Sequence, residues 1–270
     1  MREVVLGLGA VVALAGPGGS GPILAAQAAA SDSPPRPAVA RGDSLMTAGR
    51  TEAALDAWQR GLEGAPGDVT LLWKTSMGLS TLAKETPGRE GDGARLRESI
   101  ELARQATRQG PRVSRAHTAL AIALGSYGDY LAHVYRIQKA REVIDLGQRS
   151  YDAIERARVL DPDDYAPYVF LGVFHRRLAT VHPVVKAIAR TFLGGYPDVS
   201  LEESASLLRR AVELDPMSVS ARTELALTYR AMERGEDARR TYREALELEP
   251  RSRLERIALD HAREYLAGSS

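Results

Sequence analysis

Apolar residues recur with the period of an α-helix through most of the chain after residue 38. Near the C-terminus, Ala238, Tyr242, Ala245 and Leu246 lie three or four positions apart, which places them on one face of a helix. Similar amphipathic segments follow one another in pairs, and a proline ends each pair. Proline lacks the N–H that continues a helix, and its ring clashes with the preceding turn. Each pair is therefore predicted to be a helical hairpin, and the protein to be all-α.

The prolines that end these pairs recur at related intervals. The intervals are 45, 51, 54 and 34 residues, between Pro66, Pro111, Pro162, Pro216 and Pro250. A repeated two-helix unit, enlarged by inserts in three of its copies, accounts for this series. The insert after Lys84 is rich in glycine and predicts a loop, whereas the next insert has a helical pattern. We therefore expect about five stacked hairpins, with lengthened helices in the middle of the domain.

Small residues occupy three equivalent positions in every hairpin, counted back from its terminal proline. Larger side chains would overpack a close helix contact, so these positions are the predicted contact points. On the first helix of each hairpin, called helix A, the position holds Gly42, Ser76, Ala121, Gly172 and Ala226. On the second helix, called helix B, it holds Ala54, Ser99, Ser150, Ser204 and Ala238. The position that faces the next hairpin holds Gly61, Ala106, Ala157, Ala211 and Ala245.

These hairpins resemble the tetratricopeptide repeat. Leu171-Gly172 and Ala226 on helix A, Ala238 on helix B, and the sequence ALELEP at 245–250 match the motif of that repeat at its own spacing. The resemblance implies a solenoid, in which each hairpin hides its apolar faces against its neighbours because it cannot bury them alone.

The resemblance covers roughly residues 38–250. The segment 253–268 has the pattern of one further amphipathic helix. A solenoid needs a polar outer face at its end, so this segment is predicted to be a capping helix. The predicted fold is thus an all-α, tetratricopeptide-type helical-hairpin solenoid, formed by a domain of residues 38–268.

A narrower resemblance lies in the second half of the chain. The sequences AHTALAIALG, LDPDDYAPYVFLGVFHRRLA and FLGGYPDVSLEESASLLRRAVELDP resemble bacterial relatives of the regulator of microtubule dynamics family. That family implies a tetratricopeptide-type domain with lengthened middle helices. Its eukaryotic members are linked to microtubules and organelle contacts, and one binds phospholipid. Phe174 and His175 stand where the family often carries a tryptophan. A microtubule role does not transfer to an exported bacterial protein.

The first residues have the layout of a secretory signal peptide. A basic start at Arg2 precedes an apolar run from Val4 to Ala15, and Ala26-Gln27-Ala28 supplies small residues at an A-x-A cleavage pattern. We expect residues 1–28 to be a signal peptide that directs the chain to the periplasm or the exterior, and residues 29–37 to be a proline-rich linker. The alternative is an N-terminal membrane anchor, although the apolar run is shorter than an ordinary membrane span.

Composition argues against several classes of function. The chain has 36 basic and 35 acidic residues, and a net charge of +1 does not suit a nucleic-acid-binding protein. Cysteine is absent, which removes disulfides, thiolate metal sites and cysteine nucleophiles. The five histidines form no H-E-x-x-H pair. We therefore predict no metal, no cofactor and no nucleic acid. The excess of arginine and the absence of asparagine indicate a GC-rich bacterial genome.

No group of residues predicts catalysis. The acidic clusters at Glu202-Glu203 and at 161–164 lie at helix starts or turns, where capping and the helix dipole explain them. His175 occupies a core-facing position and is interpreted as a packing histidine whose hydrogen bonds are satisfied. No G-x-S-x-G elbow is present. We expect a binding protein and not an enzyme.

The concave face of the solenoid is the predicted binding site. In this repeat type the exposed face of each helix A lines an inner groove. The apolar and threonine positions there are Trp73, Met77, Thr118, Ile122, Val169, Val173, Thr223 and Leu227. They are flanked by Arg115, Arg176, Arg177 and Arg230.

Three interpretations of this face stay open. As a groove it would hold a peptide or partner helix, with the arginines binding carboxylates, as in a protein–protein interaction scaffold. The alternative ligand is lipid-like, an acyl chain with an acidic headgroup. In the third interpretation, the inserts fold over the face and turn it into ordinary core.

Overall fold

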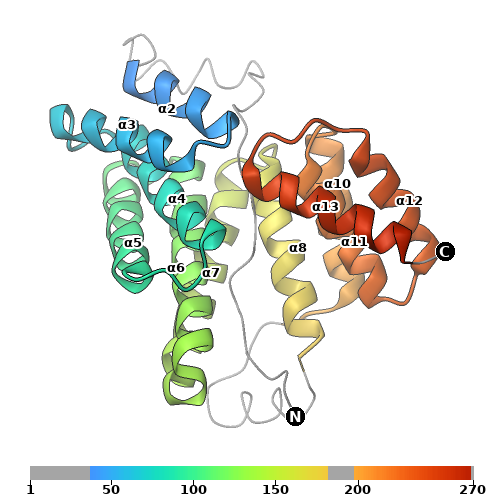
Figure 1. The fold of residues 1–270 in the computed structure, drawn as a ribbon. Coiled ribbons are helices and arrows are strands. Elements are labelled where there is room, and N and C mark those ends of the chain that lie inside the picture. Colours follow the sequence, from blue (N-terminus) through green and yellow to red (C-terminus); the bar gives the residue numbers. More distant parts are fainter. Residues whose placement is uncertain (1–36, 182–197, 269–270) are drawn as a thin grey trace.

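The chain folds into α-helices throughout the part that the structure describes. A computed structural model describes residues 37–181 and 198–268, and within these ranges it contains eleven α-helices, one short 3-10 helix and no strand (Figure 1). The helices of the first three hairpins are α2 (Pro37–Thr47), α3 (Thr51–Gly64), α4 (Val69–Glu85), α5 (Asp92–Gln109), α6 (Ser114–Tyr135), η1 (Arg136–Lys139) and α7 (Ala140–Leu160). The remaining helices are α8 (Tyr165–Ala179), α10 (Leu201–Leu214), α11 (Val219–Ala231), α12 (Gly235–Leu246) and α13 (Arg253–Ala267).

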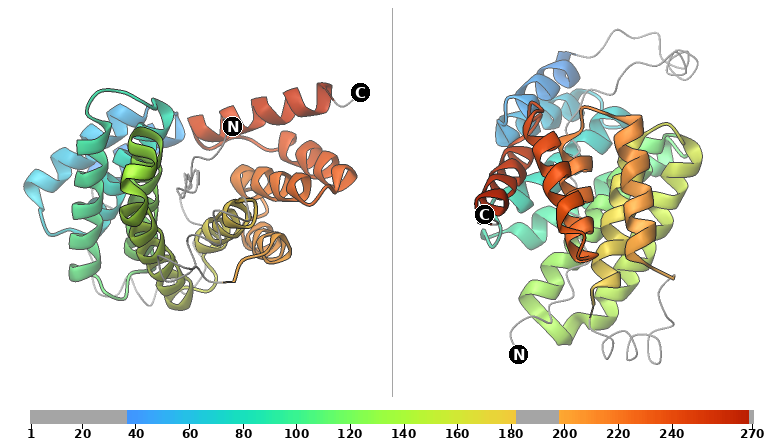
Figure 2. Two further views of the ribbon diagram at one scale, coloured as in Figure 1. Left: turned by 90° about the horizontal axis from the view of Figure 1, so that it is seen from below. Right: turned by 90° about the vertical axis from the view of Figure 1, so that its right-hand side faces the viewer.

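Ten of these helices pair into the five predicted hairpins. The pairs are α2 with α3, α4 with α5, α6 with α7, α8 with α10, and α11 with α12, and α13 packs on the last pair as a single helix. The hairpins follow one another along an arc (Figure 2). The prediction of a tetratricopeptide-type solenoid with a C-terminal capping helix is confirmed. In each hairpin the first helix is helix A and the second is helix B.

The small residues form the helix contacts. Fourteen of the fifteen predicted positions are buried, and only Gly61 is half-buried. A methyl group at Gly172 on α8 would lie 2.5 Å from Cγ of Leu208 on α10, which is less than a van der Waals contact. Gly42 on α2 is packed in the same way against the indole of Trp58 on α3. Large side chains on helix B thus fill the space that glycine leaves on helix A.

Three of the serines on helix B also form buried hydrogen bonds to helix A. The hydroxyl of each serine on helix B donates a hydrogen bond to the backbone carbonyl of the small residue on helix A. The distances are 2.8 Å from Ser99 to Ser76, 2.7 Å from Ser150 to Ala121 and 2.7 Å from Ser204 to Gly172. All three serines are at most 1% exposed, so water does not compete for these bonds. In each of the three middle hairpins, a buried hydrogen bond therefore joins helix B to helix A.

The start of most A helices is fixed by a capping residue two positions after the terminal proline. Asp68 and Asp164 accept hydrogen bonds from Leu71 N and Ala166 N at 2.8 and 3.0 Å. Ser218 and Ser252 accept from the third residue of α11 and α13 in the same manner, at 3.1 Å. Proline stops one helix and the cap begins the next, so turns between hairpins stay short.

The middle hairpin is the long one, as predicted. Helix α6 has 22 residues and α7 has 21, against 13 and 12 in α11 and α12. In the glycine-rich insert after Lys84, Glu85 still belongs to α4, residues 86–91 form the loop, and the last residues belong to α5. Phe170 and Phe174 on α8 are buried at the centre of the largest apolar cluster, which reaches from α5 to α12. Helix α8 is thus the packing centre of the domain.

The two ends of the arc meet. The guanidinium of Arg256 on α13 lies against Gly49, in the turn between α2 and α3, where a side chain would collide with it. Gly49 has a φ of +73°, which also favours glycine. Glu85, at the end of α4, accepts a 3.0 Å hydrogen bond from the Thr51 hydroxyl. The left view of Figure 2 shows α13 returning toward α2 and α3. The capping helix therefore contacts the first hairpin as well as the last.

Some sequence predictions fall outside the described residues. They are the signal peptide at 1–28, nearly all of the linker at 29–37, and most of the insert that enlarges the fourth hairpin, at 182–197. In the described ranges, no helix combines the length and the apolar character that crossing a membrane requires.

The buried serine bond makes a testable prediction for stability. Replacing Ser204 with alanine removes its bonds to Gly172 and to the Thr228 hydroxyl, and should lower the free energy of unfolding by about 1–2 kcal/mol. Ser206, two residues along α10, is exposed, so Ser206→Ala makes the same change of helix propensity without a buried bond. Urea unfolding of both variants measures the difference. Equal stabilities for the two variants would contradict the role of the hydroxyl.

Candidate functional site

The predicted binding residues lie on the A helices α4, α6, α8 and α11, and we call the surface they form the inner face. Its middle is core: the buried members are Thr118, Ile122, Val169, Val173 and Thr223. Its two ends are more open, because Trp73 and Met77 on α4 and Leu227 on α11 are half-buried. Accessible apolar side chains are therefore found at the ends of the inner face and not along its middle. Whether these residues bind a ligand stays a prediction.

The arginines of the inner face already have partners. Nε of Arg115 on α6 lies 2.9 Å from Oδ2 of Asp164, the residue that caps α8. Arg176 on α8 forms an ion pair with Glu224 on α11. Arg230 is exposed, and its guanidinium stacks 4.3 Å from the ring centre of Tyr265 on α13. Arg115 and Arg176 thus join neighbouring hairpins, so a ligand carboxylate would have to displace a protein carboxylate from either.

Three further ion pairs also join residues that are far apart in the sequence. Lys74 on α4 binds Asp43 on α2 at 2.8 Å, Arg177 on α8 binds Asp129 on α6 at 3.2 Å, and Arg251 binds Asp215 at 2.7 Å. The ammonium of Lys74 also lies 4.5 Å from the ring centre of Trp73. Sequence reasoning missed these pairs, since their members lie 31–48 residues apart, and none belongs to a local motif.

Lys84 is influenced by charged groups on several helices of the arc. It stands in the last turn of α4 and is half-buried. Burial lowers the pKa of Lys84 to about 8, while the charges of Asp129 and Glu224 raise it and Arg177 lowers it. These charged neighbours come from α6, α8 and α11, so helices along most of the arc influence Lys84. The interior of the arc carries charges of both signs.

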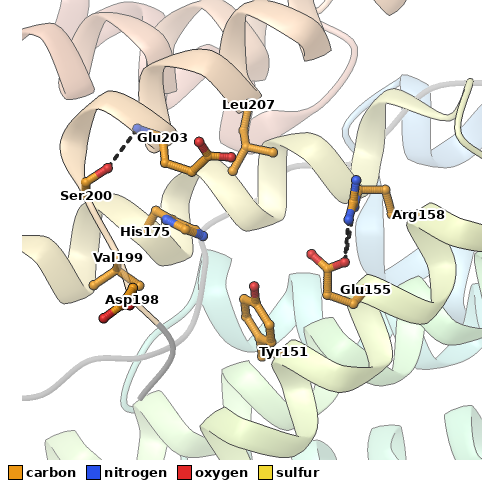
Figure 3. Close-up of a pocket in the computed structure, with 9 residues that line it drawn as sticks. All are labelled: Tyr151, Glu155, Arg158, His175, Asp198, Val199, Ser200, Glu203 and Leu207. Carbon is orange, nitrogen blue, oxygen red and sulfur yellow. Dashed lines mark hydrogen bonds and ion pairs between the residues drawn. The ribbon is translucent and has the colours of Figure 1, made fainter. Parts of the chain in front are cut away.

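The structure contains a pocket that the sequence did not reveal. It lies between α7, α8 and α10, and its volume is about 520 Å³ (Figure 3). Helix α7 contributes Tyr151, Glu155 and Arg158, α8 contributes His175, α10 contributes Glu203 and Leu207, and the segment 198–200 completes the wall. This volume falls in the usual range for pockets that hold small ligands.

The pocket combines acidic groups with a buried histidine. Arg158 forms an ion pair with Glu155 at 2.6 Å. Ser200 caps α10, because its hydroxyl accepts a hydrogen bond from the backbone N–H of Glu203. His175 is only 6% exposed, and its Nδ1 has no hydrogen-bond partner among the described residues. Burial lowers the pKa of His175, although Glu203 and Glu155 act in the opposite direction. The prediction of a buried packing histidine was right about burial and wrong about satisfied hydrogen bonds.

Metal binding has no support in the described ranges 37–181 and 198–268. No group of three or more histidine, aspartate or glutamate side chains there has the arrangement of a metal site.

Comparison with known proteins agrees with this architecture. A family model described as regulator of microtubule dynamics protein 1-3 matches residues 38–270. Regulator of microtubule dynamics protein 1 of Mus musculus is 24% identical over 179 residues, which are 66% of this chain and 56% of that protein. The protein of the same name from Bos taurus is 24% identical over 177 residues, covering 65% and 53%. The chain thus spans about half the length of the curated relatives it matches.

A solved structure shows the same fold. The crystal structure of a thermophilic TPR protein in Thermus thermophilus superimposes with a TM-score of 0.58 at 18% sequence identity, and covers 83% of this chain and 95% of that one.

Lys84 should make stability depend on pH. The folded state loses its proton near pH 8 and the unfolded chain near 10.5, so wild-type stability should rise between these values, by up to about 3 kcal/mol. Lys84→Met should remove this rise. Lys139→Met, at an exposed lysine, is the matched control and should keep it. Urea unfolding at several pH values tests this, and a rise that persists in Lys84→Met would refute the assignment.

Proposed function

The chain belongs to the regulator of microtubule dynamics protein 1-3 family, and from this premise we propose that it is a non-catalytic scaffold that holds a short segment of a partner polypeptide on its inner face. Tetratricopeptide-type solenoids present an extended concave surface for binding, and the stacked hairpins of this chain have that form. The partner itself is not identified by the fold.

The observation that carries this proposal is the accessible apolar side chains at the two ends of the inner face. The charge of Glu224 on α11 acts on Lys84 on α4, so both helices face one interior. The half-buried apolar residues there, Trp73, Met77 and Leu227, are candidate anchors for apolar side chains of a partner.

The ion pairs of the inner face refine the proposed mode of binding. Arg115 and Arg176 already hold protein carboxylates, so the proposed partner is held by apolar contacts at the two ends of the inner face. The lipid-like ligand stays an alternative, and no contact in the described part of the chain favours it over a peptide.

Site-specific photo-crosslinking in the native host tests the scaffold. A photoreactive phenylalanine at position 73 should capture a defined polypeptide, whereas the same group at the exposed position Gln59 on α3 should not. Adding Leu227→Asp should abolish the adduct at position 73, since both ends are proposed to hold one segment. Val159→Asp places the same charge on an exposed residue and is the matched control.

Two outcomes would count against the scaffold. A polypeptide adduct that survives Leu227→Asp would show that the two ends do not share a ligand. Native mass spectrometry that reveals a bound mass of several hundred daltons, extractable into organic solvent, would favour the lipid-like ligand instead.

Export is a separate proposal, supported by the pattern of residues 1–28 alone. The mature chain is expected to begin near Ala28 after cleavage. N-terminal sequencing of the protein recovered outside the cytoplasm measures this, and a start at Met1 would contradict cleavage and favour the anchor.

A further inference from the structure

We infer that α13 is a strap that closes the arc, and that it parts from the first two hairpins while it stays attached to the fifth. The opening is a movement of the chain itself and needs no partner. Only its use, which is to admit a partner segment to the inner face, rests on the proposed function.

The attachment of α13 to the fifth hairpin contains a buried carboxylate. Glu255, in the first turn of α13, is 2% exposed. It accepts hydrogen bonds from the Ser220 hydroxyl on α11 at 2.9 Å, from Ser220 N at 3.3 Å and from Arg251 N at 2.6 Å. Breaking these bonds would leave a buried charge without partners, which is costly. The network therefore fixes the start of α13 to the fifth hairpin.

The apolar contacts of α13 add to this attachment. Leu259 and Ala262 are its buried members in two apolar clusters. The other members belong to α11 and α12, except for Leu248 just after α12 and two further residues of α13. Neither cluster includes a described residue of the first or second hairpin. Apolar burial in these clusters therefore holds α13 to the fifth hairpin alone.

The contact of α13 with the start of the arc is different, because it is made by exposed arginines. Arg253 and Arg256 are exposed, and the guanidinium of Arg256 lies against Gly49. Burial raises the pKa of Glu85 at the end of α4, and the hydrogen bond from Thr51 lowers it. The charges of Arg253 and Arg256 also lower it, so they stabilise the ionised Glu85. Attraction between exposed charges is weak and is screened by salt.

This contact, which we call the junction, is the weakest connection around the arc. The first hairpin is held to the second by an apolar cluster that contains Trp58 of α3 and Leu71 of α4, and by the ion pair between Lys74 and Asp43. Buried contacts thus hold the helices on both sides of the junction. The left view of Figure 2 shows α13 between the two ends of the arc. When the arc flexes, separation at the junction costs least.

The junction is connected to both ends of the inner face. Glu85 is the last residue of α4, the helix that carries Trp73 and Met77. At the other end, Leu227 of α11 packs against the cluster that contains Ala262 of α13. Parting the junction therefore moves α13 and Leu227 away from α4, and widens the approach to the apolar side chains at both ends.

Distances between spin labels test the opening. The chain has no cysteine, so labels attach only at introduced positions. The exposed pair Ala48→Cys and His261→Cys spans the junction, and Glu244→Cys with His261→Cys spans α12 and α13 as the control. Replacing both Arg253 and Arg256 with glutamine should raise the population with a longer junction distance roughly threefold, the effect of an exposed ion pair. The control distance should not change.

Single variants separate charge from shape. Glu85→Gln keeps an acceptor for the Thr51 hydroxyl but removes the charge, so it should open the junction as the double variant does. Arg263→Gln changes an exposed arginine whose partner, Asp260, lies on α13 itself, and should leave the junction closed. Raising the salt concentration from 0.1 to 1 M shortens the screening length from about 10 to about 3 Å and should open the wild-type junction.

A labelling rate measures access to the inner face without a partner. Met77→Cys should react with a bulky maleimide roughly threefold faster when Arg253 and Arg256 are both replaced by glutamine, in step with the open population. Gln59→Cys, at an exposed position on α3, is the matched control and should react at the same rate in both backgrounds.

Each contrary result has a defined meaning. An unchanged junction distance in the double variant, or equal effects of Glu85→Gln and Arg263→Gln, would overturn the strap. So would a control distance that lengthens, since α13 would then be leaving the fifth hairpin. An open junction with an unchanged labelling rate at Met77→Cys would refute the control of access. None of these measurements involves a partner, so a failed photo-crosslinking experiment counts against the scaffold alone.

Discussion

The close contact between helix A and helix B within each hairpin is the constraint on which the structure depends. Glycine, alanine and serine at these positions let the backbones approach, and the serines in the three middle hairpins add a buried hydrogen bond to a backbone carbonyl. The space left by Gly42 and Gly172 is filled by Trp58 and Leu208 from the opposite helix. Small and large residues are thus complementary, and this sets the geometry with which every hairpin stacks on the next.

Much of this fold follows from the sequence because its signals are local. The terminal prolines, the small residues and the helical period each act within one hairpin, so five hairpins and a capping helix were predictable. The contact between Arg256 and Gly49 was not. This contact depends on the curvature that accumulates over all five hairpins. No short segment of the sequence predicts the total curvature. The hydrogen bonds of Ser99, Ser150 and Ser204 were missed for another reason, since small size alone already explained serine there.

In the candidate sites, too, local sequence predicts some features, whereas others depend on distant residues. The positions of the inner face were placed correctly on the A helices, but their exposure and the partners of Arg115 and Arg176 depend on residues roughly 50 positions away. The pocket was missed because three helices and a connecting segment contribute its lining. His175 was the one local signal, since it stands in the region where the family resemblance leads one to expect a tryptophan. A histidine in place of a large apolar ring leaves a buried polar atom that packing alone does not explain.

The junction of the capping helix with the first hairpin changes how stability is distributed. In an open solenoid each unit contacts only its neighbours, so the terminal units fray independently and copies are gained or lost with little penalty. Here Arg256 seats against a turn more than two hundred residues earlier in the chain. Inserting or deleting a hairpin would move these two surfaces apart. The number of hairpins is thereby coupled to the integrity of both termini, and the domain should melt as one cooperative body instead of as a linear array.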